Sequence, residues 1–214
     1  TSVNNQPSRS KNSPNTNVQA LMTYELMTKR ASVGFWIESQ EIRGFDSHNN
    51  RANVLSQKGQ SNQLTRMDRH LWTPLKTLAA KLKATQYAGT GKSYWDFTTC
   101  VLASEMGRSL GGADDDVCQH WNTSSVAFLG GTVKGGTQFG RVGTGSLDAI
   151  PIMPDGSLDP AFDPNTGQPR GTPSPLGFVP DAGHVYATAL ELAGIPKSAQ
   201  KGKNTRPALS FVKK

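Results

Sequence analysis

The sequence predicts an α/β protein with a mainly parallel sheet. Apolar residues at helical spacing alternate along the chain with short runs rich in aromatic and β-branched residues, and polar, glycine-containing loops follow those runs directly. Three candidate strands are few for 214 residues. We therefore expect part of a larger sheet, whose open edge needs a covering partner.

Three segments are expected. Residues 1–16 form a polar leader, residues 17–196 the folded half-domain, and residues 197–214 a basic tail. The net charge is +7, and six basic residues but no acid lie in the tail. Because a nucleic-acid-binding domain carries its basic residues on the folded body, we expect no specific nucleic-acid binding. The tail is either solvated or docked on an acidic partner surface.

The first half of the chain predicts two helical regions and a strand. A helix begins at Asn17, a buried strand covers Val33–Glu38, and the clearest helical pattern covers Asn62–Thr85. Pro74 should kink this last helix or begin a second one.

The second half predicts two further strands and a closing helix. The strands are Phe97–Ala103 and Val126–Leu129, expected to be adjacent to each other and mainly parallel. A long loop over 144–180 follows, rich in proline, glycine and aspartate and able to wrap a neighbour. The closing helix, Asp181–Leu192, should stop at Gly194.

Composition excludes several classes of protein. No apolar run approaches the roughly 20 residues of a membrane span. The only cysteines, Cys100 and Cys118, are too few for a disulfide scaffold or a four-cysteine zinc site. The sequence allows two alternatives, a disulfide between Cys100 and Cys118 or a buried free thiol at Cys100. The opening segment, without an initial Met or an apolar stretch, indicates a processed or truncated product.

Three polar loops carry candidate chemistry. In an extended loop Asp46 and His48 point the same way and can bind one cation, although Asp46 can equally cap a turn. Glu105 and Arg108 follow the second strand, as a site or as an ion pair that holds the loop. His120 supplies a further imidazole, as a ligand or as an exposed side chain.

Two other patterns have ordinary structural interpretations. Gly130–Gly136 is glycine-rich but lacks the Lys-Ser/Thr ending of a P-loop, which favours a hairpin with Lys134 at its tip. Asp114–Asp116 and the series Asp155, Asp159 and Asp163 could bind Ca²⁺, but solvated acidic loops explain them better.

Five motifs in order resemble one bacterial family. They read Gly-Phe-Asp-Ser-His, Ser-Glu-Met-Gly-Arg-Ser, Gln-His-Trp, Leu-Gly-Gly-Thr-Val-Lys-Gly-Gly and Gly-His-Val-Tyr-Ala-Thr-Ala-Leu-Glu-Leu-Ala-Gly-Ile. This series is similar to the carboxyl-terminal half of the "domain of unknown function fifteen-oh-one" proteins, in the alkaline-phosphatase/sulfatase-like superfamily. The likeness runs from about Val18 to Ile195.

The resemblance implies a partial α/β/α sandwich and an exported, periplasmic or cell-surface protein, since the family usually carries a twin-arginine signal. It implies a divalent metal (Zn, Mn, Mg or Ca) held by Asp46, His48 and His120, and catalytic roles for Glu105 and Arg108 in the hydrolysis of a phosphate or sulfate ester. Gln replaces the family's Asp before His120, and Glu105-Met106 stands where the superfamily has an Asp-His pair.

The superfamily's nucleophile lies in an amino-terminal half that this chain lacks. The resemblance therefore implies a partner, either that amino-terminal half or another subunit. The alternative function is a non-catalytic structural or interaction subunit of a larger assembly, with the same fold in degenerate form.

Overall fold

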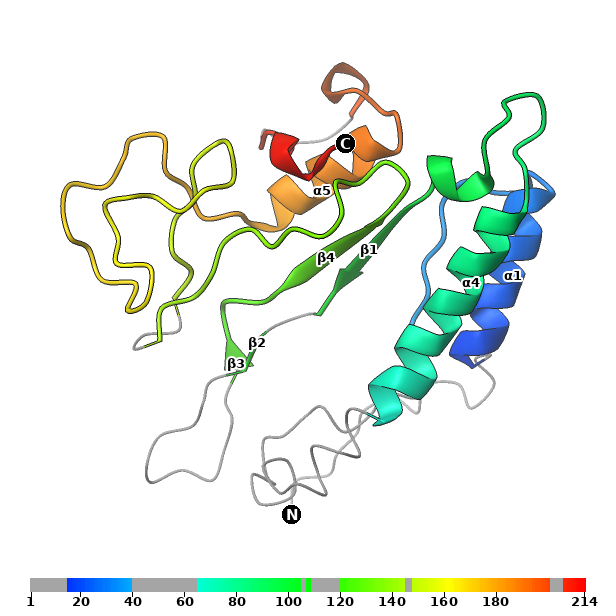
Figure 1. Ribbon diagram of the computed structural model, residues 1–214, viewed down its shortest axis with the longest axis horizontal. Helices are drawn as coiled ribbons and strands as arrows, with labels where there is room; N and C mark the ends of the chain where they lie inside the picture. The colour runs from blue at the N-terminus through cyan, green and yellow to red at the C-terminus, as the bar shows by residue number, and fades with distance from the viewer. Residues whose placement is uncertain (1–14, 40–64, 105–106, 109–119, 145–147, 201–205) are drawn as a thin grey trace, which may run out of the picture. The chain divides into compact units, whose positions relative to one another are not determined.

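The computed structural model describes residues 15–39, 65–104, 107–108, 120–144, 148–200 and 206–214 (Figure 1). The chain divides into two compact units, Thr1–Gly91 and Lys92–Lys214. Each unit has its own packing and is described separately. Together their described residues contain helices and short antiparallel strands, which confirms a mixed helix-and-strand fold.

Two helices pack against each other in the first unit (Figure 1). Helix α1 covers Thr16–Thr28, close to its predicted start, and the Asn15 side chain caps it by accepting from the Val18 amide at 2.9 Å. Helix α4 covers Thr73–Ala84 and buries Leu78 and Leu82. The clear helical pattern of the sequence is confirmed here.

Helix α1 buries its small residues and exposes its large apolar ones. Its buried positions are Thr16, Ala20 and Thr23. Small side chains at these positions allow the helices to pack closely. The larger apolar residues, which the sequence pattern placed on one face, remain substantially exposed: Val18, Leu21, Met22 and Leu26.

Pro74 lies in the first turn of α4, and a π-helical turn, Asp68–Trp72, precedes it. Proline has no N–H to donate to the carbonyl four residues earlier, which belongs to His70. That carbonyl instead accepts the Ser39 hydroxyl at 3.1 Å, and Ser39 Oγ accepts from Thr16 Oγ1 at 3.0 Å. The proline thus begins the regular helix and leaves a carbonyl that ties three segments together.

The strand predicted over Val33–Glu38 is wrong. This segment has no strand partner among the described residues. The side-chain amide of Gln19 takes the place of a neighbouring strand, donating to the Glu38 carbonyl at 3.0 Å and accepting from the Glu38 amide at 3.2 Å. A short apolar run shows that a segment is extended, but a strand also needs a backbone partner.

The second unit contains two short antiparallel ladders (Figure 1). Strand β1, Thr99–Ala103, pairs with β4, Val126–Gly130, and β2, Gly107–Arg108, pairs with β3, His120–Trp121. The predicted adjacency of β1 and β4 is confirmed, but their predicted parallel direction is wrong. Parallel neighbours need a crossover, usually a helix, whereas the described residues between β1 and β4 contain the antiparallel pair β2–β3.

The first residues of the predicted strand Phe97–Ala103 are helical instead. A 3-10 turn covers Tyr94–Phe97, and β1 begins after it. The Asp96 carboxylate accepts from both the amide and the hydroxyl of Ser93, at 2.8 and 2.7 Å. This local capping box outweighs the aromatic content of the segment.

The core of the second unit lies under helix α5, Ala182–Leu192. It consists of Val133, Leu192, Leu209 and Val212, with Phe128, Phe178 and Phe211 against it. Helix α5 ends as predicted: Gly194 has φ +81°, and its amide donates to the Glu191 carbonyl at 3.0 Å.

Candidate functional site

Two of the predicted site residues occupy opposite positions on one ladder. Strands β2 and β3 are antiparallel, and the register pairs Arg108 with His120 and Gly107 with Trp121. Opposite residues of an antiparallel pair have Cα atoms about 4.5–5.5 Å apart. The structure therefore brings together a guanidinium-bearing and an imidazole-bearing residue that are separated in sequence.

The antiparallel direction of β1 and β4 explains this pairing. The carboxyl end of β1, at Ala103, lies opposite the amino end of β4, at Val126. The segment that leaves β1 and the segment that enters β4 thus start from the same end of the ladder. Near that end the Ser104 and Ser124 hydroxyl oxygens lie 2.7 Å apart. Beyond that end, the described residues form the second antiparallel pair, β2–β3.

The other three predicted site residues, Asp46, His48 and Glu105, lie outside the described residues. We predict from the sequence that these three converge with Arg108 and His120 on one pocket at the carboxyl edge of the sheet, and this stays a prediction. Within the part of the chain that the structure describes, no three His, Cys, Asp or Glu side chains group as a metal site would require. Asp114–Asp116 and Cys118 also lie outside the described residues.

The other cysteine, Cys100, lies on β1. Burial raises the pKa of its thiol.

The first two glycines of the glycine-rich motif are required by packing. A Cβ on Gly131 would lie 2.4 Å from the Asp96 Cα, and one on Gly130 would lie 1.9 Å from the Thr98 carbonyl oxygen. The Gly131 amide donates to the Trp95 carbonyl at 3.1 Å. These two residues therefore let the end of β4 pass against the backbone before β1.

Beyond them, the motif pairs with the carboxyl-terminal segment. Val133 forms an isolated antiparallel bridge with Lys213, and the Lys134 amide donates to the Val212 carbonyl at 2.9 Å. Val133 is buried and Lys134 is exposed. In place of the predicted hairpin, the motif therefore pairs with a segment that is distant in the sequence. Lys134 lies on the exposed side of this pairing.

The aspartates of the 144–180 loop hold local turns. Asp155 accepts from the Ser157 hydroxyl and amide at 2.7 and 2.9 Å, and those bonds lower its pKa. Asp159, which is 1% exposed, accepts from the amides of Ala161 and Ser174, each at 2.9 Å. These bonds give Asp155 and Asp159 structural roles in turns, and the prediction of a solvated acidic loop is wrong for the buried Asp159.

Asp163 has the same role at the next turn. It accepts from the amides of Asn165 and Thr166, at 2.7 and 2.9 Å, and forms an ion pair with Arg170. The Thr166 amide, the Asn165 amide and the Arg170 charge together lower the pKa of Asp163 to about 2. Ile150 and Ile152 are buried within this loop, so it folds on itself.

Sequence reasoning missed a polar cluster at the start of α5. Asp181 caps the helix by accepting from the His184 amide at 3.1 Å, and its Oδ1 lies 2.8 Å from His184 Nδ1. The His184 ring is buried and stacks on Phe178 at 4.9 Å. The same Nδ1 accepts from the backbone amide of Asp181 at 3.2 Å, so the two residues cap the helix start reciprocally. An Asp three residues before a His at a helix start was the available signal.

The basic tail carries charges that are paired inside the chain. Arg206 Nε donates to Asp181 Oδ2 at 2.8 Å, and Lys213 forms an ion pair with Glu191. Burial raises the pKa of Asp181, but the contacts with His184 and the charge of Arg206 outweigh it and hold that pKa below its usual value. Residues 206–214 thus pack along α5, where the sequence suggested a solvated or partner-bound tail.

Mixed helix and strand content, the Arg108–His120 ladder and a tightly packed Gly-Gly turn define the described part of this chain. A family model, Protein of unknown function (DUF1501), matches residues 4–150. Since this is more than half of the 214 residues, the chain belongs to that family. The matched residues end before α5. The likeness that the sequence motifs indicated, from about Val18 to Ile195, is therefore matched only as far as residue 150.

The other comparisons identify no relative of known activity. Neither the curated proteins nor the solved structures contain a significant match. No helix among the described residues is long and apolar enough to cross a membrane.

Proposed function

We propose that this chain is part of an exported, alkaline-phosphatase/sulfatase-like protein that hydrolyses phosphate or sulfate esters with a divalent metal. The observation that carries the proposal is the register of Arg108 opposite His120. Opposite positions of an antiparallel pair are neighbours, so this short ladder brings a residue type that binds oxyanions next to one that binds metals. The resemblance of the five sequence motifs to the alkaline-phosphatase/sulfatase-like superfamily leads to the same proposal, whereas the matched family model carries no function of its own.

The roles follow from side-chain chemistry. Arg108 binds two ester oxygens through its planar guanidinium. Asp46, His48 and His120 supply the carboxylate and imidazole donors that suit Zn²⁺ or Mn²⁺, and Mg²⁺ or Ca²⁺ are the oxygen-preferring alternatives. Glu105 acts beside Arg108 as a proton acceptor or by orienting it. When bound, the metal polarises the ester oxygen and lowers the pKa of an attacking hydroxyl or water.

The nucleophile and the remaining sheet come, in this proposal, from the amino-terminal half that the resemblance implies. A parallel α/β/α sandwich requires those additional strands, and the protein acts outside the cytoplasm, in the periplasm or at the cell surface. In this proposal the 214-residue chain contributes the residues that bind the anion and the metal.

The test measures metal binding to the full 214-residue chain. Calorimetric titration with Zn²⁺ or Mn²⁺ should give one site, and His120→Ala should weaken its affinity at least tenfold. His70→Ala, on the π-helical turn of the other unit, is the matched control and should bind as the parent does. Equal affinity in His120→Ala and the parent would remove His120 from the metal site.

Hydrolysis is measured with the amino-terminal half added. Aryl phosphate and aryl sulfate distinguish the two ester classes, and Arg108→Lys should reduce kcat/KM by at least tenfold because a lysine cannot bind two oxygens in a fork. Absence of turnover together with intact metal binding would favour the non-catalytic function.

A second function is supported by exposed apolar surface in the first unit. The large apolar residues of α1, Val18, Leu21, Met22 and Leu26, are exposed, and Trp36 is 89% exposed. Such contiguous apolar positions on a helix are typical of an association surface. On this proposal the chain is a structural or interaction subunit, and its partner is the amino-terminal half or another subunit.

Light scattering after size-exclusion chromatography decides this point. The chain alone should self-associate or precipitate, and Leu21→Gln with Met22→Gln should reduce that tendency. Lys76→Gln, at an exposed position of α4, is the control and should not. A stable, soluble 23.0 kDa monomer would exclude an obligate partner.

A further inference from the structure

The second pair of glycines in the glycine-rich motif has no packing role, in contrast to the first. A Cβ at Gly135 or at Gly136 would meet no atom within 4 Å. Gly136 has φ +74° and needs glycine for its conformation, but Gly135 has no positive φ. Neither sterics nor backbone conformation therefore explains why glycine stands at position 135.

The backbone after Lys134 is open as well as uncrowded. Lys134 is anchored through its amide to the Val212 carbonyl at 2.9 Å, beside the buried Val133. The following four amides, those of residues 135–138, make no hydrogen bond within the described part of the chain. All four residues are exposed. A fixed lysine is thus followed directly by a run of available N–H donors.

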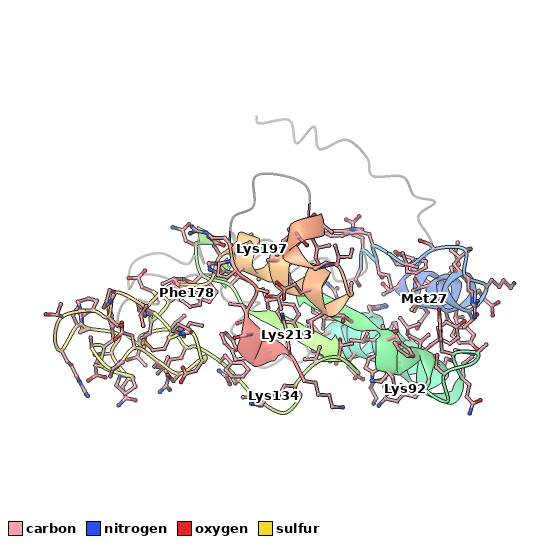
Figure 2. The ribbon with its side chains drawn as sticks, turned by 90° about the horizontal axis from the view of Figure 1, so that it is seen from above. Met27, Lys92, Lys134, Phe178, Lys197 and Lys213 are labelled. Carbon is pink, nitrogen blue, oxygen red and sulfur yellow. The ribbon has the colours of Figure 1, made fainter. Side chains whose placement is uncertain are left out.

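The charge around this segment is positive. Residues 131–143 contain Lys134 and Arg141 and no acid. Lys214, which is also exposed, donates its amide to the Thr132 carbonyl at 3.1 Å. Of the neighbouring acids, Glu191 is paired with Lys213 and Asp96 interacts with Lys92 and Lys214. Figure 2 shows Lys134 on the loop at the lower margin of the view.

We propose that residues 134–138 form a binding site for a tetrahedral oxyanion, the phosphate or sulfate group of a ligand. Consecutive backbone amides form anion-binding concavities, and a lysine ammonium adds charge-assisted hydrogen bonds. Glycine at position 135 leaves the backbone accessible to the anion. Lys134 contacts the anion directly, and the amides of residues 135–138 orient it.

This site is separate from the Arg108–His120 pair. Gly130 lies opposite Thr99 at one end of the β1–β4 ladder, and Val126 lies opposite Ala103 at the other end, towards β2 and β3. Four steps along a strand span about 13 Å. The oxyanion site therefore does not depend on the proposed hydrolase function or its metal.

The experiment is an NMR titration of the ¹⁵N-labelled full chain, without added metal, at constant ionic strength maintained with NaCl. Inorganic phosphate and sulfate are titrated separately. We expect saturable shifts of the amides of residues 135–138 in the millimolar range or tighter. Stronger binding of one anion identifies its group as the ligand class.

Variants distinguish a built site from general attraction to lysines. Lys134→Gln should weaken binding at least fivefold, whereas Lys197→Gln, which removes the same charge after α5, should leave it unchanged. Gly135→Ala should leave the melting temperature unchanged, because its Cβ meets open space, and should weaken binding at least fivefold.

Three outcomes would overturn the proposal. The first is the absence of saturable shifts at residues 135–138. The second is equal weakening by Lys134→Gln and Lys197→Gln, which would indicate unspecific charge attraction. The third is a Gly135→Ala variant that binds as tightly as the parent. None of these readouts involves ester hydrolysis, so failure here leaves the proposed function standing, and the reverse also holds.

Discussion

The Thr188 hydroxyl accepts a hydrogen bond from the backbone amide of Leu209 at 2.8 Å, in the interior of the second unit. The same hydroxyl donates to the His184 carbonyl at 2.7 Å, and Thr188 is 0% exposed. One side chain of α5 thus satisfies a buried backbone donor of the carboxyl-terminal segment. This bond lies between the Arg206–Asp181 and Lys213–Glu191 ion pairs along the segment.

Replacing Thr188 with Val should therefore destabilise the second unit. Valine has nearly the same shape but leaves the Leu209 amide without an acceptor, at a cost of about 1–3 kcal/mol. Urea denaturation measures the loss. Thr188→Ser keeps the hydroxyl and should retain more stability than the Val variant. Equal stability of the Val variant and the parent would show that water satisfies the amide.

Asp163 should make stability depend on pH in the acid range. Its pKa is lowered to about 2 from an ordinary 3.8, first by the amides of Thr166 and Asn165. A carboxyl group with a lowered folded pKa contributes stability above its unfolded pKa and loses it as the pH falls through the folded value. The contribution is therefore complete above about pH 4 to 5 and fades towards pH 2.

The Asp163→Asn variant tests this dependence by thermal unfolding between pH 7 and pH 2. The variant should be less stable than the parent at neutral pH, and the difference should narrow as the pH falls. A difference that stays constant over this range would assign the role of Asp163 to geometry and not to its charge.

Gly131 should not tolerate alanine, whereas Gly135 should. A Cβ on Gly131 would lie 2.4 Å from backbone at Asp96, and neither partner can move without disturbing the turn before β1. We expect Gly131→Ala to lower the midpoint of thermal unfolding by several degrees, as a loss of about 1–3 kcal/mol would. Gly135→Ala is the matched control from the same motif. Similar midpoints for the two variants would contradict the close approach at Gly131.

Leu82 should be the most sensitive position of α4, since it is 0% exposed. Truncation to alanine removes buried methyl groups and leaves a cavity, at a cost of about 2–5 kcal/mol. Circular dichroism during denaturation measures the change, and Lys76→Ala at an exposed position of the same helix is the control. A loss below 0.5 kcal/mol would show that the α1–α4 contact collapses around the smaller side chain.

Local patterns were sufficient where the physical cause is local. The ends of α5 follow from Asp181 and Gly194, because capping bonds join residues a few positions apart. Of the two alternatives given for Pro74, the start of a second helix is the one that forms, and the strand predicted over Val126–Leu129 forms as β4, Val126–Gly130. The proximity of Glu105, Arg108 and His120 to strands was also readable, although only Arg108 and His120 can be placed.

Other features required distant partners that no local pattern identifies. Strand direction was mispredicted because side-chain alternation is the same in parallel and antiparallel strands, and only the pairing of Ala103 with Val126 decides it. The segment Val33–Glu38 is extended but bonds to the side chain of Gln19, so it is not a strand.

The charges of the carboxyl-terminal segment show the same limit. The sequence shows that residues 197–214 are basic, but only the folded chain shows that Arg206 forms an ion pair with Asp181 and Lys213 with Glu191. The sequence by itself determined the ends of α5, the helical character of the α4 segment and the family, since these depend on local pattern and motif order. The tertiary structure alone decided strand direction, charge pairing and the meeting of Arg108 with His120, because each depends on contacts between residues far apart in the chain.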